Sequence, residues 1–157
     1  MKIGFIGVGN LGEKAVTKLS KDYDLFLSDP IEKDELKKVT NGYFSLEETI
    51  NSSDVIFFTI KPNMIGELFS KNDFNLQDKT FISFMAGLSL DKIEKMKVIF
   101  NQIKNYVPIL LIEHNMDVVI SIADRISVLV NGKIIASGSS SEIKSNLDVR
   151  KAYLGTA

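Results

Sequence analysis

Short apolar runs alternate with stretches of helical spacing along residues 1–97. The apolar runs are rich in β-branched and aromatic side chains, which is typical of strands in a parallel sheet covered on both faces. They predict strands at residues 2–6, 24–28, 54–60 and 80–85. Helices are predicted where Leu11, Ala15 and Leu19 recur at every fourth position, at residues 31–39, and after a capping box of Ser45 and Glu48. Repeated strand–helix alternation of this kind predicts a doubly wound α/β sheet.

Residues 98–157 follow a different pattern, with a predicted strand at 107–112, a helix at 115–123, a hairpin of strands 125–130 and 133–137, and a helix up to about residue 154. The hairpin prediction rests on Asn131-Gly132, the dipeptide that favours a type I′ turn. Ser139 and Glu142 form a second capping box before the last helix. We therefore expect a C-terminal strand–helix–hairpin–helix extension. Its strand at 109–112 is suited to join the first sheet in parallel.

Composition excludes several kinds of site. The 157 residues are 45% hydrophobic and 25% charged, as expected of one globular domain with a sizeable core. The net charge of −1 gives no indication of nucleic-acid or anionic-membrane binding. With no cysteine and His114 as the single histidine, neither a disulfide scaffold, a thiolate metal site nor a multi-histidine metal site is expected. No apolar run reaches the roughly 20 residues of a membrane span and no signal peptide is visible, so a cytoplasmic protein without membrane insertion is predicted.

The run Gly7-Val8-Gly9-Asn10-Leu11-Gly12 fits the G-x-G-x-x-G pattern of dinucleotide-binding loops. It follows a predicted strand and opens a predicted helix, which is the context that the pattern requires. Gly7 would allow the tight turn, Gly9 would let the backbone approach a pyrophosphate, and Gly12 would let helix and strand pack closely. The helix N-terminus would supply N–H donors to the phosphates. The sequence therefore predicts a Rossmann-like, mainly parallel sheet with a dinucleotide-binding domain at 1–97 and an extension at 98–157, and places Gly7, Gly9, Asn10, Leu11 and Gly12 in the cofactor site.

Asp29 ends the second predicted strand and bears on the choice of cofactor. A carboxylate at this position accepts hydrogen bonds from the ribose hydroxyls of NAD and repels the 2′-phosphate of NADP. No arginine precedes Arg125, and Lys33 is the cation near enough in sequence to compensate. NAD is therefore favoured over NADP. An alternative remains open, since Asp29-Pro30 is also a good start for a helix.

Residues 1–97 resemble the N-terminal domain of pyrroline-5-carboxylate reductase, an enzyme of proline synthesis that reduces a cyclic imine. The glycine loop, Ser53-Asp54-Val55-Ile56-Phe57-Phe58-Thr59-Ile60-Lys61-Pro62 and Ile82-Ser83-Phe84-Met85-Ala86-Gly87-Leu88-Ser89-Leu90 carry the resemblance. It implies that Thr59, Ile60, Lys61, Pro62, Met85 and Ala86 contact the nicotinamide half of the cofactor. The chain departs from the family where Ser45-Leu46 stands in place of a common asparagine, and where Asp29 ends the second strand. The family's helical dimerisation and substrate domain has no counterpart, so catalytic residues are not identified.

Residues from about 107 to 155 resemble the C-terminal tail of an ATP-binding cassette ATPase of the branched-chain amino acid uptake type. The resemblance rests on Ile109-Leu110-Leu111-Ile112-Glu113-His114-Asn115-Met116-Asp117, Ala123-Asp124-Arg125-Ile126, Val130-Asn131-Gly132-Lys133-Ile134-Ile135-Ala136-Ser137-Gly138 and Ala152-Tyr153-Leu154-Gly155. It implies a γ-phosphate-sensing role for His114. The sequence contains no G-x-x-x-x-G-K-[ST] loop, no Leu-Ser-Gly-Gly-Gln segment and no strand ending in Asp-Glu, all of which that chemistry requires. A structural role for His114 and no ATPase activity are therefore expected.

Two classes of function follow. The first is an NAD(P)-binding protein derived from an imine reductase, which would bind a dinucleotide and position its nicotinamide ring over a C=N bond. A β-hydroxyacid reductase is a rival within that class, because it shares the glycine loop. The second is a fusion product or interaction module whose ATPase-like tail docks a transporter subunit, or which folds without activity. Self-association is expected if the tail leaves an apolar patch exposed.

Overall fold

The computed structural model describes residues 1–61, 64, 68, 74, 76–84 and 107–154. The chain divides into two compact units, Met1–Glu113 and His114–Ala157. The sequence placed the domain boundary at residue 97, which lies outside the described residues and stays a prediction. Each unit has its own sheet.

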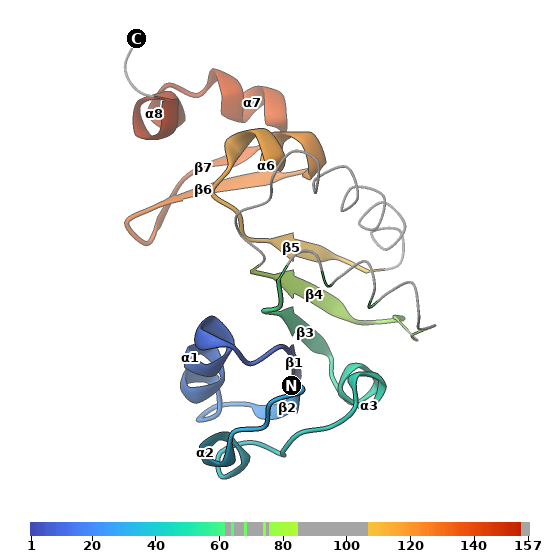
Figure 1. Cartoon of the computed structure of the whole chain (residues 1–157). Coiled ribbons are helices and arrows are strands. Elements are labelled where there is room, and N and C mark those ends of the chain that lie inside the picture. Colours follow the sequence, from blue (N-terminus) through green and yellow to red (C-terminus); the bar gives the residue numbers. More distant parts are fainter. Residues whose placement is uncertain (62–63, 65–67, 69–73, 75, 85–106, 155–157) are drawn as a thin grey trace. The chain divides into compact units, whose positions relative to one another are not determined.

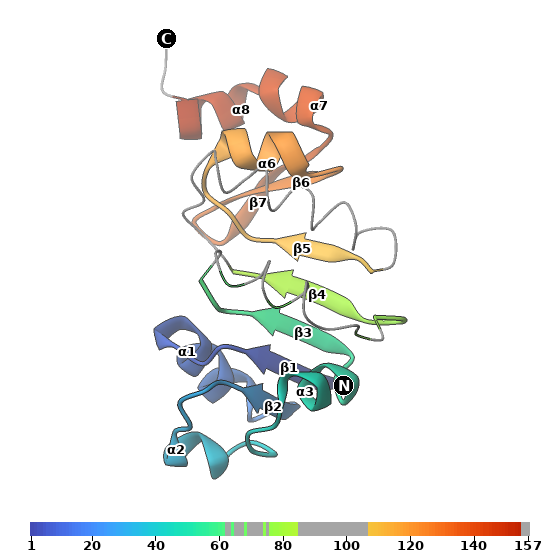
Figure 2. The same cartoon turned by 45° about the vertical axis from the view of Figure 1, so that its right-hand side comes forward.

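The first unit is built on a five-stranded parallel sheet in the order β2-β1-β3-β4-β5 (Figures 1 and 2). Its strands are β1 (Lys2–Ile6), β2 (Asp24–Ser28), β3 (Val55–Phe58), β4 (Thr80–Ser83) and β5 (Ile109–Leu111). Each neighbouring pair is parallel, with Phe5 opposite both Leu27 and Phe57. β5 joins β4 in parallel, as expected from the sequence. The Rossmann-like parallel α/β fold is thereby confirmed.

A short segment extends this sheet beyond β2. Residues 41–44 run parallel to β2 through an isolated bridge between Leu27 and Tyr43. Three backbone hydrogen bonds join the segments, including Leu27 N–H to the Gly42 carbonyl at 3.0 Å and Phe44 N–H to the Leu27 carbonyl at 2.8 Å. With this segment counted as a rudimentary third strand, the order becomes the 3-2-1-4-5-6 of dinucleotide-binding sheets. The point at which the chain reverses direction across the sheet then lies between β1 and β3.

Helices cover both faces of the sheet near β1. α1 (Asn10–Leu19) and α3 (Leu46–Asn51) lie on opposite sides of it in Figure 1, and α2 (Asp34–Lys37) contacts α1. α1 buries Val16 against a core of strand side chains that includes Ile3, Phe5 and Leu25. α3 begins at the predicted capping box, in which the Ser45 side chain accepts from Glu48 N–H and the Glu48 carboxylate accepts from Ser45 N–H.

The second unit contains α6 (Met116–Ile122), β6 (Ile126–Val130), β7 (Lys133–Gly138), α7 (Ser140–Ser145), α8 (Leu147–Val149) and a π-helical turn, Arg150–Leu154. β6 and β7 form an antiparallel hairpin whose turn residues Asn131 and Gly132 have φ of 49° and 77°. These positive angles are those of the predicted turn. The hairpin is a separate two-stranded sheet and does not extend the parallel one. Its core is made of Ile126, Val128, Ile143 and Val149.

Several predicted elements are shorter in the structure. The helix expected at 31–39 is limited to α2, because the backbone at Lys33 is still extended and Lys38 already ends the helix. The strands expected at 54–60, 80–85 and 107–112 are paired in the sheet only over the shorter ranges of β3, β4 and β5. The last helix is broken at Asn146, whose side chain accepts hydrogen bonds from the N–H groups of Asp148 and Val149 and thereby begins α8.

Candidate functional site

The glycine loop joins β1 to α1 at the carboxyl edge of the sheet. Gly7 has a φ of +87°, a conformation that side-chain-bearing residues rarely adopt. Its N–H donates to the Ser28 carbonyl at 2.9 Å, which ties the turn to the end of β2. A Cβ added at Gly7 would lie 2.6 Å from Cγ2 of Ile60. The turn therefore needs glycine both for its backbone angle and for its contact with the segment after β3.

Gly12 lies where α1 comes closest to the sheet. A Cβ here would be 2.7 Å from the Gly7 carbonyl oxygen and 2.8 Å from Oγ1 of Thr59. That hydroxyl donates a short hydrogen bond to the Gly7 carbonyl, and Thr59 N–H donates to the Ile6 carbonyl at 3.0 Å. Thr59 thus braces the turn from the end of β3, and Gly12 leaves room for this contact.

Gly9 differs from both because it faces open space. A Cβ added to it would have no heavy atom of the described chain within 4 Å apart from its own neighbours. Gly9 is the N-cap of α1, and no described side chain caps this helix end. Gly9, Asn10 and Leu11 are all exposed, Leu11 with 51% of its surface. The first N–H groups of a ten-residue helix are therefore accessible beside a residue with no side chain, an arrangement that fits a pyrophosphate.

Asp29, directly after β2, is fixed against the glycine loop. One carboxylate oxygen accepts from Val8 N–H at 2.5 Å and the other from Ile31 N–H at 2.8 Å. The N-cap of α2 is Lys33, so the alternative in which Asp29 merely caps the following helix is wrong. The Val8 contact holds the half-buried carboxylate next to Gly9 and the accessible N–H groups at the start of α1, which together are called the open cradle below. Each carboxylate oxygen has a further lone pair that can accept a hydrogen bond from a hydroxyl group.

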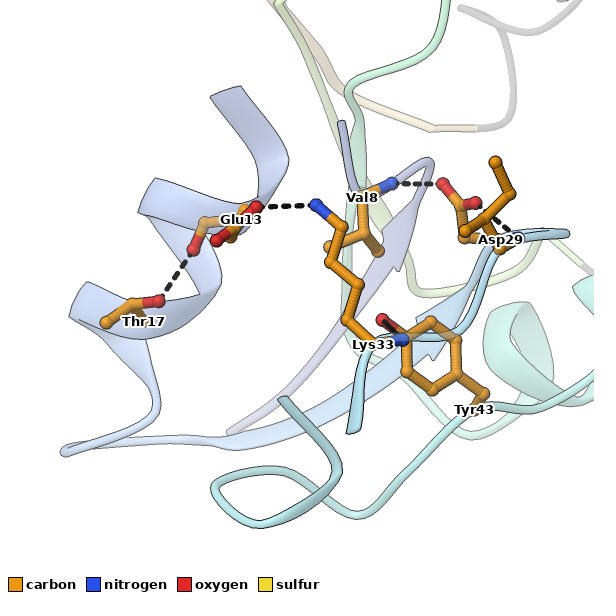
Figure 3. A network of polar contacts seen from close by, with 7 residues as sticks. Val8, Glu13, Thr17, Asp29, Lys33 and Tyr43 are labelled. Atoms are coloured by element: carbon orange, nitrogen blue, oxygen red, sulfur yellow. Dashed lines mark hydrogen bonds and ion pairs between the residues drawn. The ribbon is translucent and has the colours of Figure 1, made fainter. Parts of the chain in front are cut away.

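A second contact joins α1 to the segment after β2 (Figure 3). The Lys33 ammonium donates to the carboxylate of Glu13, in the first turn of α1. This hydrogen bond and charge raise the pKa of Lys33 above its ordinary value. The backbone N–H of Lys33 donates to the Tyr43 hydroxyl at 3.1 Å, and burial raises the pKa of that phenol. The contact from Val8 to Asp29 and the Lys33–Glu13 ion pair therefore hold the same two segments together.

Residues 2–87 match the protein family described as NADP oxidoreductase, coenzyme F420-dependent. The chain belongs to this family. The match covers the glycine loop, Asp29 and Thr59, so the residues described above lie in the part of the chain that the family defines.

Two solved structures share the fold of this family member at low sequence identity, and a third is similar to it in sequence. An imine reductase from Myxococcus stipitatus, a V8 variant in complex with NAD+, matches with a TM-score of 0.57 and 14% identity over 70% of this chain and 39% of that one. A D-isomer specific 2-hydroxyacid dehydrogenase from Lactobacillus delbrueckii ssp. bulgaricus, in its NAD complex, has a TM-score of 0.54 and 17% identity over 73% and 35%. Pyrroline carboxylate reductase from Plasmodium falciparum, with NADP bound, is 27% identical over 61% and 37%, with a TM-score of 0.48.

The end of the chain is similar to another group of proteins. Residues 133–157 match the family described as branched-chain amino acid ATP-binding cassette transporter. A high-affinity branched-chain amino acid transport ATP-binding protein of Salmonella typhimurium is 40% identical over 74 residues, 46% of this chain. A probable protein of the same description from Archaeoglobus fulgidus is 41% identical over 49 residues. The chain spans 29% and 19% of the length of these two relatives. Both resemblances inferred from the sequence are thus confirmed.

The structure brings most of the predicted site residues to one edge of the sheet. Gly7 to Gly12 follow β1, Asp29 follows β2, and Thr59, Ile60 and Lys61 follow β3. Pro62, Met85 and Ala86 lie outside the described residues. The roles of Glu13 and Tyr43 were not predicted, because their contacts with Lys33 span 20 and 10 residues. The position of Glu13 directly after the last glycine of the loop is the signal that was available.

The described part of the chain contains no group of three or more His, Cys, Asp or Glu side chains placed to hold a metal ion. Among its helices, none has the length and apolar character to cross a membrane. The cytoplasmic location remains a prediction.

Proposed function

We propose that the first unit binds NAD(H) at the carboxyl edge of its sheet, and presents the nicotinamide for hydride transfer to a C=N bond. The observation that carries the proposal is the open cradle at Gly9, with uncapped N–H groups of α1 on one side and the anchored Asp29 carboxylate on the other. This cradle lies beside the reversal point between β1 and β3, which is where ligands bind in doubly wound sheets.

Different residues of this chain would bind different parts of the cofactor. The N–H groups at the start of α1 would hold the pyrophosphate, and Asp29 would accept hydrogen bonds from the ribose hydroxyls. The bound dinucleotide would cover the exposed Leu11 side chain and so remove its apolar surface from water. Thr59 to Pro62, with Met85 and Ala86, would line the nicotinamide half, as the resemblance to pyrroline-5-carboxylate reductase implies. A bound nicotinamide supplies the hydride.

Charge favours NAD over NADP. Residues 29–35 carry four carboxylates, Asp29, Glu32, Asp34 and Glu35, against one lysine, Lys33. That lysine is paired with Glu13, and Lys37 is paired with Glu32 and Asp34 at 2.6 and 3.3 Å. A 2′-phosphate brings about 1.5–2 further negative charges next to Asp29. The carboxylates of Glu32 and Asp34 are exposed and screened by solvent, so they contribute less to this repulsion. The preference for NAD would distinguish this chain from the NADP of its family's description.

A fluorescence titration of the whole chain with NADH and NADPH tests the proposal. NADH is expected to bind with a lower Kd than NADPH by about tenfold, one charge-assisted hydrogen bond's worth of free energy. Asp29→Asn should weaken NADH binding and reduce the difference between the Kd values for NADH and NADPH. Asp34→Asn removes the same charge from a side chain that is 91% exposed, and should change the ratio little. Absence of saturable binding by either nucleotide overturns the proposal.

Turnover is tested separately. NADH oxidation in the presence of a cyclic imine such as 1-pyrroline-5-carboxylate would support the imine reductase. NAD reduction by a β-hydroxyacid would support the rival within the same class. If the chain binds NADH but turns over neither substrate, the cofactor site stands and its role in these two reactions falls.

A second function is favoured by the tail alone, which has its own hydrophobic core and matches an ATP-binding cassette family. The second unit would act as an interaction module without ATP hydrolysis, or be a fused segment with no activity. Co-purification with a membrane subunit of an uptake transporter would support the module. Magnesium-dependent ATP hydrolysis would contradict both versions.

A further inference from the structure

The ion pair between Lys33 and Glu13 joins the segment after β2 to the first turn of α1, at the adenosine side of the proposed cofactor site. We infer that Glu13 is a specificity-determining residue: by holding the Lys33 ammonium, it withholds from a 2′-phosphate the cation that would otherwise neutralise it, and so keeps the site selective for NAD. This inference rests on the proposed function, and concerns how the choice between the two dinucleotides is made.

Lys33 belongs to the segment that follows β2. It lies four residues after Asp29 on the same connection, and its backbone is fixed by the Tyr43 hydroxyl. Its side chain reaches from there to the first turn of α1, where Glu13 N–H donates to the Gly9 carbonyl at 2.8 Å (Figure 3). The ammonium therefore lies between the glycine loop and the strand end that carries the ribose-binding carboxylate. Sites that accept NADP place a cation in this neighbourhood.

The Lys33 ammonium is paired but able to move. The Lys33 and Glu13 side chains remain 25% and 40% exposed, and ion pairs with this much solvent contact are weak. A lysine is a flexible point charge that can turn to a nearby phosphate when its partner is removed. Loss of Glu13 would therefore add an available cation to the site and remove a carboxylate that repels the 2′-phosphate.

The Lys33–Glu13 pair differs from the ion pairs of Lys37 nearby. Lys37 is also held by carboxylates, but Glu32 and Asp34 belong to the same short segment, and neither is in α1. The Lys33–Glu13 pair instead joins the segment after β2 to the helix that opens the phosphate cradle. Removal of Glu32 changes the net charge by the same amount but leaves Lys33 with its partner. The chain thus supplies a matched control.

The experiment compares Kd values for NADH and NADPH in the whole chain, its Glu13→Gln and Glu32→Gln variants, and the double variant Glu13→Gln/Lys33→Gln. Glu13→Gln is expected to tighten NADPH binding about tenfold, the scale of one hydrogen bond to a charged group, and to leave NADH binding within about twofold. Glu32→Gln should change NADPH binding by less than about twofold because the charge it removes is exposed and screened. The double variant should lose the gain. Glu13→Ala should reproduce it without leaving an amide.

The outcomes separate the two proposals. If wild type binds NADH and Glu13→Gln gains no affinity for NADPH, the role of Glu13 is overturned and the cofactor site stands. An equal gain in Glu32→Gln, or a gain that survives in the double variant, also overturns it, because net charge alone would then explain the effect. If neither the wild type nor the variants bind either nucleotide, both proposals fail. Unchanged NADH binding by Glu13→Gln shows that the variant has folded.

Discussion

Replacing Gly9 by valine should abolish dinucleotide binding while the protein remains folded. The backbone at Gly9 has φ −71° and ψ −167°, which any residue can adopt. A Cβ at this position meets no described atom within 4 Å, so the side chain would extend into the open cradle and not into the core. The substitution therefore acts on the space that the proposed pyrophosphate needs.

The magnitudes differ enough to be separated. A poor N-cap residue costs about 0.5–1 kcal/mol relative to glycine, judged from N-cap replacement series. In a chain of this size, that lowers the Tm by about 1–4 °C. A pyrophosphate kept from the helix N-terminus loses about two charge-assisted hydrogen bonds of 1.5–3 kcal/mol each, which raises the Kd at least about 100-fold. Gly9→Ala should give an intermediate loss of affinity.

Thermal unfolding and NADH titration of the same samples provide the assay. Thr17→Val is the matched control because it places the same side chain on an exposed position of α1, about two turns from the cradle. It should bind NADH as wild type does. A folded Gly9→Val variant with wild-type affinity would refute the placement of the phosphates at this helix end.

Three further predictions concern stability. Gly12→Ala should destabilise the first unit by about 1–3 kcal/mol, since its Cβ would lie 2.7 Å from a backbone carbonyl oxygen; an unchanged denaturant midpoint would contradict this close approach. Hydrogen bonds from Ser45 lower the pKa of Glu48 below its ordinary 4.5, so the stability it contributes is present above pH 4.5 and is lost as pH falls through its folded-state pKa. The difference in Tm between wild type and Glu48→Gln should therefore change between pH 7 and pH 3, and a constant difference would argue against this linkage. Ile143→Ala should cost the second unit about 2–5 kcal/mol and leave NADH binding intact, which hydrogen exchange and titration would check together; loss of NADH binding would show that the site depends on the tail.

Each of the two units is stabilised by its own hydrophobic core. The first unit buries Ile3, Phe5 and Leu25 between a parallel sheet and its helices. The second packs α7 and α8 on a hairpin, with Ile143 and Val149 as core residues. Because each unit has its own core, a cofactor site in the first can be studied by variants that leave the second untouched.

Much of the fold was accessible from local sequence, because its signals act over a few residues. β1, β2 and the two capping boxes match their predictions, since alternation, turn residues and i to i+3 hydrogen bonds are short-range properties. The hairpin turn at Asn131 and Gly132 was predictable for the same reason. Helix ends were harder to predict. The break at Asn146 arises because its side chain accepts hydrogen bonds from the first N–H groups of α8, and the preceding helix therefore ends there.

The sequence by itself predicted the place of the proposed phosphate site, from three glycines between a strand and a helix. Only the tertiary structure decided how the three differ: Gly7 and Gly12 are packed against Ile60 and Thr59, more than 45 residues away, and Gly9 alone is open. It also decided the partners of Asp29 and Lys33. Such contacts depend on the register of neighbouring strands, which brings Ser28 level with Ile6, a residue that is distant in the sequence.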